Sequence, residues 1–151
     1  MTSANTNMTA YLLDSFSGAL TTLTLKRETY IDQIKAHINC TFFDVVRIDD
    51  HHDVFVDDNG LTDGLYTVSH LKDFPNPLAG NLVIVGRTEE GDIANPRMSL
   101  EEVAALFRIY RPVMDPDLTG FQKPGMIGIG VAGFKVRLEE SRPILAGGEV
   151  S

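Results

Sequence analysis

One uninterrupted apolar stretch, NLVIVGR at residues 81–87, constrains the fold more than any other part of the sequence. It has the length of a single strand, contains several β-branched residues, and shows no alternation of apolar and polar positions. Such a run is typical of a strand that is buried on both faces, because neither of its two sets of side chains suits water. The sequence therefore predicts a sheet with residues 81–87 at its centre.

Two hairpins are predicted before this strand. TAYLLD at 9–14 and ALTTLTLK at 19–26 are rich in β-branched or apolar residues and are separated by the turn residues SFSG. TFFDVVRI at 41–48 and VFVDD at 54–58 have the same character and are separated by DDHHD. Asn59 and Gly60 then give a strong turn signal. Residues 64–80 contain two prolines and are predicted to be a connecting loop with one short element.

Two segments carry helical signals. In residues 28–39 three isoleucines recur on one helical face, at Ile31, Ile34 and Ile38. Asn39 follows them as the predicted C-cap. The second helix is predicted to begin at Ser99, because Glu102 three residues later completes a capping box. Its apolar stripe has the spacing i, i+3, i+4, i+7 and consists of Val103, Leu106, Phe107 and Tyr110. Pro112 is expected to end this helix.

These elements predict an α+β fold, with a mixed or antiparallel sheet of about five strands and two helices on one face. We expect residues 1–8 to be a flexible N-terminus, 9–111 to be the α+β domain and 112–151 to be a Gly/Pro-rich C-terminal extension or arm. A strand-like alternation occurs within that extension, at Phe134, Val136 and Leu138.

Composition and charge limit the function. The chain is 43% hydrophobic and 23% charged, which is ordinary for a globular protein, and it has no apolar run of membrane-spanning length or signal-peptide start. A cytoplasmic location is therefore expected. Residues 44–63 hold seven aspartates and one arginine, a large part of the net charge of −8. This argues against direct nucleic-acid binding, which needs a Lys/Arg footprint, and leaves a basic protein partner open. Cys40, the single cysteine, is interpreted as a structural thiol.

The acidic and histidine residues of the second hairpin suggest a divalent metal site, and thus a metal-dependent enzyme, formed by five candidates: Asp49, His51, His52, Asp53 and Asp57. Adjacent side chains on a strand point to opposite faces, so a solvated turn is favoured over a metal site. Asp57 and Asp58 as a general acid and base would need one pKa raised by burial, and exposure is favoured there. No catalytic residue, metal or cofactor is assigned.

The same region is a candidate contact surface for a partner, formed by Asp49, Asp50, Asp53, Asp57 and Asp58. GIGVAG at 128–133 matches the glycine spacing of a dinucleotide site, which requires a strand before it and a helix after it. The following residues, FKVRLEE, alternate like a strand, so dinucleotide binding is not expected.

The order of the predicted elements resembles a family of uncharacterised small domains encoded mainly by phages, plasmids and other mobile elements. The resemblance covers about residues 9–110 and rests on four stretches: FDVVRI at 43–48, VFVDDNG at 54–60, PLAGNLVIVGR at 77–87 and MSLEEV at 98–103. The family is a domain of unknown function, so the resemblance implies no activity or ligand. DDHHD stands where members usually have a tighter turn, and residues after Pro112 lie outside the family pattern.

Three functions follow as hypotheses. The favoured one is a non-enzymatic accessory protein of a mobile genetic element that binds another macromolecule, most simply a protein. The first alternative is an acidic decoy, such as an antirestriction-type inhibitor, that occupies the basic groove of a DNA-binding protein. The second is the metal-dependent enzyme described above. A homo-oligomer formed through residues 112–151 is also left open.

Overall fold

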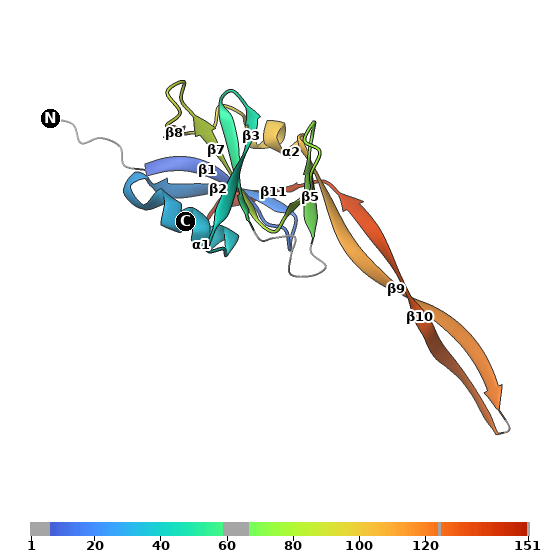
Figure 1. Cartoon of the computed structure of the whole chain (residues 1–151). Helices are drawn as coiled ribbons and strands as arrows, with labels where there is room; N and C mark the ends of the chain where they lie inside the picture. The colour runs from blue at the N-terminus through green and yellow to red at the C-terminus, as the bar shows by residue number, and fades with distance from the viewer. Residues whose placement is uncertain (1–6, 59–66, 124, 151) are drawn as a thin grey trace.

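The computed structural model describes residues 7–58, 67–123 and 125–150, and the described chain is mostly β (Figure 1). Its elements in chain order are β1 (Asn7–Leu13), β2 (Ala19–Lys26), a 3-10 turn (Arg27–Thr29), α1 (Tyr30–Ile38), β3 (Phe43–Asp49), β4 (His52–Asp57), β5 (Val68–Leu71), β6 (Leu78–Ala79), β7 (Leu82–Arg87), β8 (Ile93–Ala94), α2 (Leu100–Ala104), β9 (Phe107–Lys123), β10 (Met126–Ser141) and β11 (Ile144–Val150). The predicted Asn59-Gly60 turn and residues 1–6 of the predicted N-terminal segment lie outside the described residues.

The larger sheet has seven strands, with the main order β11-β2-β1-β7-β4-β3 and with β8 paired to β7. β7 lies between β1 and β4, and its residues from Leu82 to Gly86 are buried. This confirms the central strand that the apolar run predicts. Both predicted hairpins are confirmed as well, as β1–β2 and β3–β4. β11 joins the other edge of the sheet, parallel to β2.

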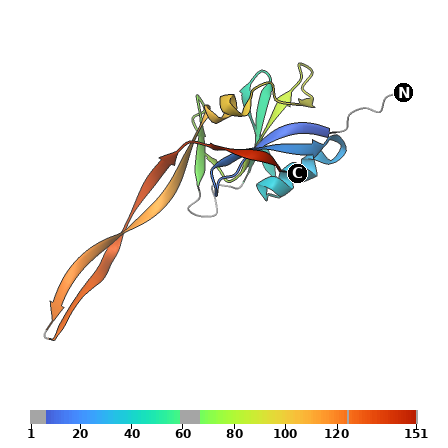
Figure 2. The same cartoon turned by 180° about the vertical axis from the view of Figure 1, so that it is seen from behind.

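The smaller sheet has four antiparallel strands in the order β10-β9-β5-β6. Of the long strand β9, only the first residues, from Phe107 to Tyr110, pair with β5. Beyond Tyr110, β9 and β10 continue as a two-stranded ribbon that projects far from the rest of the molecule in both views (Figures 1 and 2). We call this ribbon, Arg111–Lys123 with its partner residues in β10, the arm.

The core lies on both faces of the larger sheet, because β7 alternates between two clusters. Leu82 and Ile84 belong to the cluster that contains Val103 of α2, whereas Val83 and Val85 belong to the cluster that contains two buried residues of α1. The two helices therefore cover opposite faces, and the prediction of two helices on one face is wrong. A central strand that is apolar on both sides requires cover on both sides.

The first predicted helix is confirmed as α1, which buries Ile34 and Ile38. Asn39 adopts the left-handed conformation, with φ of 60°. The backbone N–H of Asn39 donates to the carbonyl of Ala36, and that of Cys40 donates to the carbonyl of Lys35. Asparagine tolerates this conformation better than most residues, so it acts as the expected C-cap.

The second predicted helix is much shorter than its periodicity suggests. Its capping box between Ser99 and Glu102 is present, but α2 ends at Ala104. Phe107 and Ile109 instead belong to β9, where both are buried and pair with β5. Pro112 lies inside β9 and does not end a helix. The pairing of β9 with β5 outweighs the local helical pattern, and the buried residues Phe107 and Ile109 follow the two-residue period of a strand.

The C-terminal residues form strands rather than a Gly/Pro-rich extension, and the described chain is mostly β rather than α+β with five strands. The alternation of Phe134, Val136 and Leu138 is confirmed as part of β10. Residues 67–80 contain two short strands, β5 and β6, where one short element is predicted. β9 runs through residue 112 without a break, and the division into domains at that position stays a prediction. Among the described residues no helix is long and apolar enough to cross a membrane.

Candidate functional site

The turn of the β3–β4 hairpin is organised by Asp49. Its Oδ1 atom accepts a hydrogen bond from the backbone N–H of His51 at 2.8 Å, as expected for an aspartate that caps a turn. A register shift between Arg47 and Asp49 lets Asp49 pair with His52 across the turn. The acidic turn predicted from DDHHD is therefore ordered by its own side chain.

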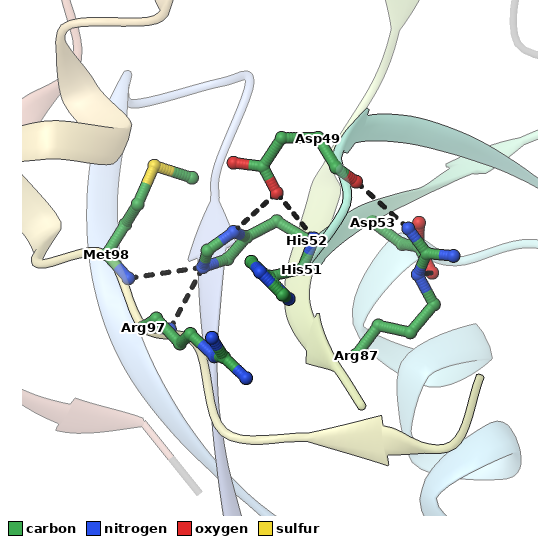
Figure 3. A network of polar contacts seen from close by, with 7 residues as sticks. All are labelled: Asp49, His51, His52, Asp53, Arg87, Arg97 and Met98. Atoms are coloured by element: carbon green, nitrogen blue, oxygen red, sulfur yellow. Dashed lines mark hydrogen bonds and ion pairs between the residues drawn. The ribbon is translucent and has the colours of Figure 1, made fainter. Parts of the chain in front are cut away.

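His52 is the buried polar residue of this turn, with only 3% of its surface exposed. Its Nδ1 atom lies 2.9 Å from Asp49 Oδ1, and its Nε2 atom accepts hydrogen bonds from the backbone N–H groups of Arg97, at 2.9 Å, and Met98, at 3.1 Å (Figure 3). Two donors at Nε2 require the neutral tautomer, which carries its proton on Nδ1 and donates it to Asp49. Both ring nitrogens are therefore engaged in holding the structure together.

The segment before α2 is held against the sheet by further contacts. The hydroxyl of Tyr11 donates to the carbonyl of Met98 at 2.7 Å, and Asn95 Oδ1 accepts the backbone N–H of Thr9 at 2.7 Å. Gly86 on β7 allows a close approach, because a Cβ atom there would lie 2.1 Å from the carbonyl oxygen of Asn95. Residues 93–98, which we call the strap, thus cross the ends of β1, β4 and β7.

Arg87, at the end of β7, binds the outer side of the same turn (Figure 3). Its Nε atom is 3.3 Å from Asp53 Oδ2, and one of its terminal nitrogens donates to the carbonyl of Asp49 at 2.9 Å. The ion pair is largely shielded from solvent, with 15 and 17% of the two side chains exposed. Asp53 therefore neutralises an arginine of the fold.

The five candidate metal ligands are not brought together. Asp57 pairs with Phe43 at the far end of the hairpin, whereas His52 pairs with Asp49 at the turn. His52 has no ring nitrogen left for a metal, and Asp53 is paired with Arg87. Within residues 7–58, 67–123 and 125–150 there is no group of three or more His, Cys, Asp or Glu side chains arranged to hold a metal ion.

The far end of the hairpin carries a second acidic group. Asp44, Asp57 and Asp58 line a cleft of about 210 Å³, whose other wall includes Phe74 and Pro77. A hydrogen bond between the carboxyl groups of Asp44 and Asp58 raises the pKa of Asp44, and the negative charge of Asp58 adds to this effect. A carboxyl group beside another carboxyl group holds its proton more tightly than one that stands alone. Asp44 is a residue that sequence reasoning about 49–58 missed.

The two acidic groups therefore differ in their electrostatics. Burial by itself would raise the pKa of Asp49, but the hydrogen bonds from the His51 backbone and the His52 ring outweigh this effect and lower the pKa overall. Asp49 is stabilised as an anion by the fold. Asp44, in contrast, is placed beside another acid on an edge strand, since β3 ends the strand order of its sheet.

Two further features of the sequence, the Cys40 thiol and the GIGVAG stretch, lie in settings that do not favour a reactive or binding role. Burial raises the pKa of the Cys40 thiol, and the nearby charge of Asp57 raises it further, although Lys35 acts in the opposite direction. A raised pKa reduces the thiolate fraction, in agreement with a structural thiol. The GIGVAG stretch lies within β10, without the strand-turn-helix context that a dinucleotide site requires.

Comparisons with known proteins agree with the resemblance seen in the sequence. A family model described as "Domain of unknown function (DUF3846)" matches residues 8–108. The chain is 32% identical over 147 residues to "Uncharacterized protein y4iR" of Sinorhizobium fredii (strain NBRC 101917 / NGR234), which covers 92% of this chain and 89% of that protein. It is 29% identical over 119 residues to "Protein PsiB" of Rhizobium leguminosarum bv. phaseoli, which covers 76% of this chain and 89% of that protein. No solved structure gives a significant match.

Proposed function

The chain belongs to the DUF3846 family of domains of unknown function, and within it we propose that this protein is a non-enzymatic accessory protein of a mobile genetic element. It acts in the cytoplasm by binding another macromolecule, a protein with a basic surface. The contact surface is the acidic β3–β4 hairpin. It comprises the five aspartates expected from the sequence, Asp49, Asp50, Asp53, Asp57 and Asp58, and Asp44 in addition.

One observation carries this proposal: Asp44, Asp57 and Asp58 line a single cleft on the surface of the hairpin. Folding gains no stability from like charges held together, whereas a lysine or arginine from a partner gains from meeting them at once. The cleft beside them has apolar walls at Val56 and Phe74, which suits the long methylene stem of such a side chain.

The position of β3 also supports binding. β3 is an edge strand, so its outer backbone groups are free of a neighbouring strand within the described sheet. An extended peptide can add to such an edge through main-chain hydrogen bonds, and its basic side chains would then alternate over the aspartates. The turn residues Asp49 and Asp53 contribute less, because their charges are already matched by His52 and Arg87.

The enzyme alternative receives less support from the same geometry. His52, Asp49 and Asp53 are each committed to contacts within the fold. The decoy alternative shares the acidic surface with the proposal and differs from it in the partner, which would be a DNA-binding protein captured through its nucleic-acid groove. Competition by DNA separates the two.

The test uses the full chain and a double variant, Asp44→Asn with Asp58→Asn. A lysine-rich decapeptide is titrated into each protein by calorimetry, with a glutamine-rich decapeptide as the neutral probe. The proposal expects the lysine peptide to bind the natural chain, and to bind the variant at least tenfold more weakly. The matched control, Glu89→Gln with Glu90→Gln, removes two charges from an exposed turn and should bind like the natural chain.

Affinity purification from the native host then identifies the natural partner, with the same variants as controls. Recovery of a basic protein by the natural chain and not by the Asp44 and Asp58 variant supports the proposal. Equal binding of the lysine peptide by all three proteins would overturn it. Hydrolytic turnover abolished by Asp57→Ala would replace the proposal with the enzyme alternative.

A further inference from the structure

The arm is amphipathic over most of its length. Its register places alternate residues of β9 and their partners in β10 on the same face. From β9 this face carries Pro112, Met114, Pro116 and Leu118. From β10 it carries Ile127, Ile129, Val131, Phe134, Val136 and Leu138. We call these ten residues the apolar strip.

A β-bulge keeps the apolar strip on one face. Before the bulge the apolar residues of β10 have odd numbers, as in Ile129 and Val131, and after it they have even numbers, as in Phe134 and Val136. Without a correction, this change of phase would send the two halves to opposite faces. The register shift between Val131 and Gly133 supplies the extra residue, so Val131 pairs with Leu118 and Phe134 pairs with Pro116. The sequence and the bulge therefore agree on a continuous apolar face.

The opposite face of the arm carries its charged residues, together with Val113. It carries Asp115, Lys135 and Arg137, and Arg137 Nε lies 2.7 Å from Asp115 Oδ2 across the two strands. Nearer the tip this face carries Thr119, which pairs with Gly130. One face of the ribbon is therefore suited to water and the other is not.

A ribbon of this kind requires a partner for its apolar face. The stretch from Arg111 to Lys123 continues for roughly 40 Å beyond the last residue of β9 that pairs with β5, at about 3.3 Å per residue. Along this stretch β9 pairs with β10 alone among the described strands. A two-stranded hairpin alone in water is marginally stable at best, and further strands or packing of its apolar face against another element are needed to stabilise it. Eight residues of the strip are more than half exposed, up to 82% for Ile127.

The partner must approach the face of the ribbon and not the edge formed by β9. Pro112 and Pro116 occupy positions of one parity in β9, so their nitrogens, which carry no hydrogen, point away from β10 to the outer edge. Prolines on an outer edge prevent the addition of another strand. What remains for contact along β9 is the apolar strip itself.

We propose that the apolar strip of the arm binds the apolar strip of a second copy of this chain, with the two arms packed face to face and pointing in opposite directions. This goes beyond the proposed function, since the acidic hairpin takes no part in it. All described residues of the strip are uncharged and apolar, so the surface is complementary to itself across a twofold axis. No residue that the register places on this face is charged, so no charge has to be matched by a different partner.

The available area is sufficient for a stable dimer. The exposures of the eight residues correspond to roughly 900 Å² of surface per arm, compared with about 800 Å² per partner in an interface of standard size. Face-to-face packing of two sheets is also the ordinary way to bury such surfaces.

The charge distribution favours arms that point in opposite directions. Residues 107–141 contain five basic and four acidic residues, a net charge of +1, so the remainder of the chain carries −9. Opposed arms place the two acidic bodies at the two ends of the contact, where their mutual repulsion is screened over the length of the arms. The acidic hairpins of both copies remain accessible in this arrangement.

The test compares two substitutions at neighbouring positions. Leu118→Lys places a charge in the middle of the apolar strip, and Thr119→Lys places the same charge on the polar face of the same strand. Sedimentation equilibrium of the full chain is measured from about 1 to 100 µM, with circular dichroism as a check that both variants keep the fold of the body. Vesicles of neutral phospholipid and host extract serve as alternative occupants.

The expected result is a dimer for the natural chain and for Thr119→Lys, and at least a tenfold weaker dimer for Leu118→Lys. A natural chain that stays monomeric at 100 µM overturns the inference, including the case in which its arm binds vesicles or a different protein instead. A dimer that is unchanged by Leu118→Lys also overturns it, because the contact then lies elsewhere. None of these outcomes depends on the lysine-peptide titration, so the two proposals fail separately.

Discussion

His52 Nδ1 lies 2.9 Å from Asp49 Oδ1, and this contact determines what the opposite side of the imidazole can do. With its proton directed at Asp49, the ring presents the lone pair of Nε2 to the backbone of the strap, at Arg97 and Met98. One aspartate in a surface turn thereby organises a segment more than forty residues away in sequence.

Replacing His52 by alanine should destabilise the protein by about 2–4 kcal/mol, because two backbone N–H groups lose their acceptor and a cavity forms at a buried position. Urea unfolding followed by circular dichroism measures this change. His51→Ala is the matched control, since the side chain of His51 accepts no hydrogen bond from the strap, and it should cost less than about 1 kcal/mol. Equal losses in the two variants would contradict the role given to His52.

The stability of the protein should fall at acid pH through Asp49. Its pKa is lowered in the folded state, so its carboxylate contributes stability above the pKa of the unfolded chain and loses it as the pH falls through the folded pKa. The free energy of unfolding, measured from pH 7 to about pH 2.5, should decrease less steeply for Asp49→Asn than for the natural chain below about pH 4. Parallel curves for the two proteins would contradict this assignment.

Asp58→Asn should raise the thermal stability at neutral pH and low ionic strength. The pKa of Asp44 is raised in the folded state, so the pair favours folding below the unfolded pKa and opposes it as the pH rises through the folded value. The gain should therefore shrink at acid pH and in about 0.5 M salt, which screens exposed charges. Glu89→Gln controls for the loss of one negative charge. A gain of equal size in both variants would remove the special role of the Asp44 pair.

Gly86→Ala should destabilise the fold by about 1–3 kcal/mol. The added Cβ atom would lie 2.1 Å from the carbonyl oxygen of Asn95, a backbone atom directly after β8, and β8 is paired with β7 at Gly86. Chemical denaturation measures the loss. Gly120→Ala is the control, because no atom lies within 4 Å of the added Cβ at that position, and its effect should be close to zero. A neutral Gly86→Ala would mean that the strap can move away without cost.

Several elements could be predicted from the sequence because their determinants are local. The first helix is marked by the spacing of its isoleucines and by an asparagine that accepts positive φ. The central strand is marked by an apolar run that is too short for a membrane-spanning helix and too apolar for an edge strand of a sheet. The capping box of Ser99 and Glu102 also formed as predicted. Each of these signals depends on residues within a few positions of one another.

The sequence alone determined a β-rich core around residues 81–87, the two hairpins, the first helix and the family, because local periodicity and turn residues suffice for these. Only the tertiary structure decided that Phe107 and Ile109 belong to a strand, since β5 offers them hydrogen bonds and burial that a helix does not. It also decided which side of the turn His52 faces, and that a bulge at Val131 keeps ten apolar residues on one face of the arm. Such contacts join residues far apart in the chain, so local sequence patterns do not predict them.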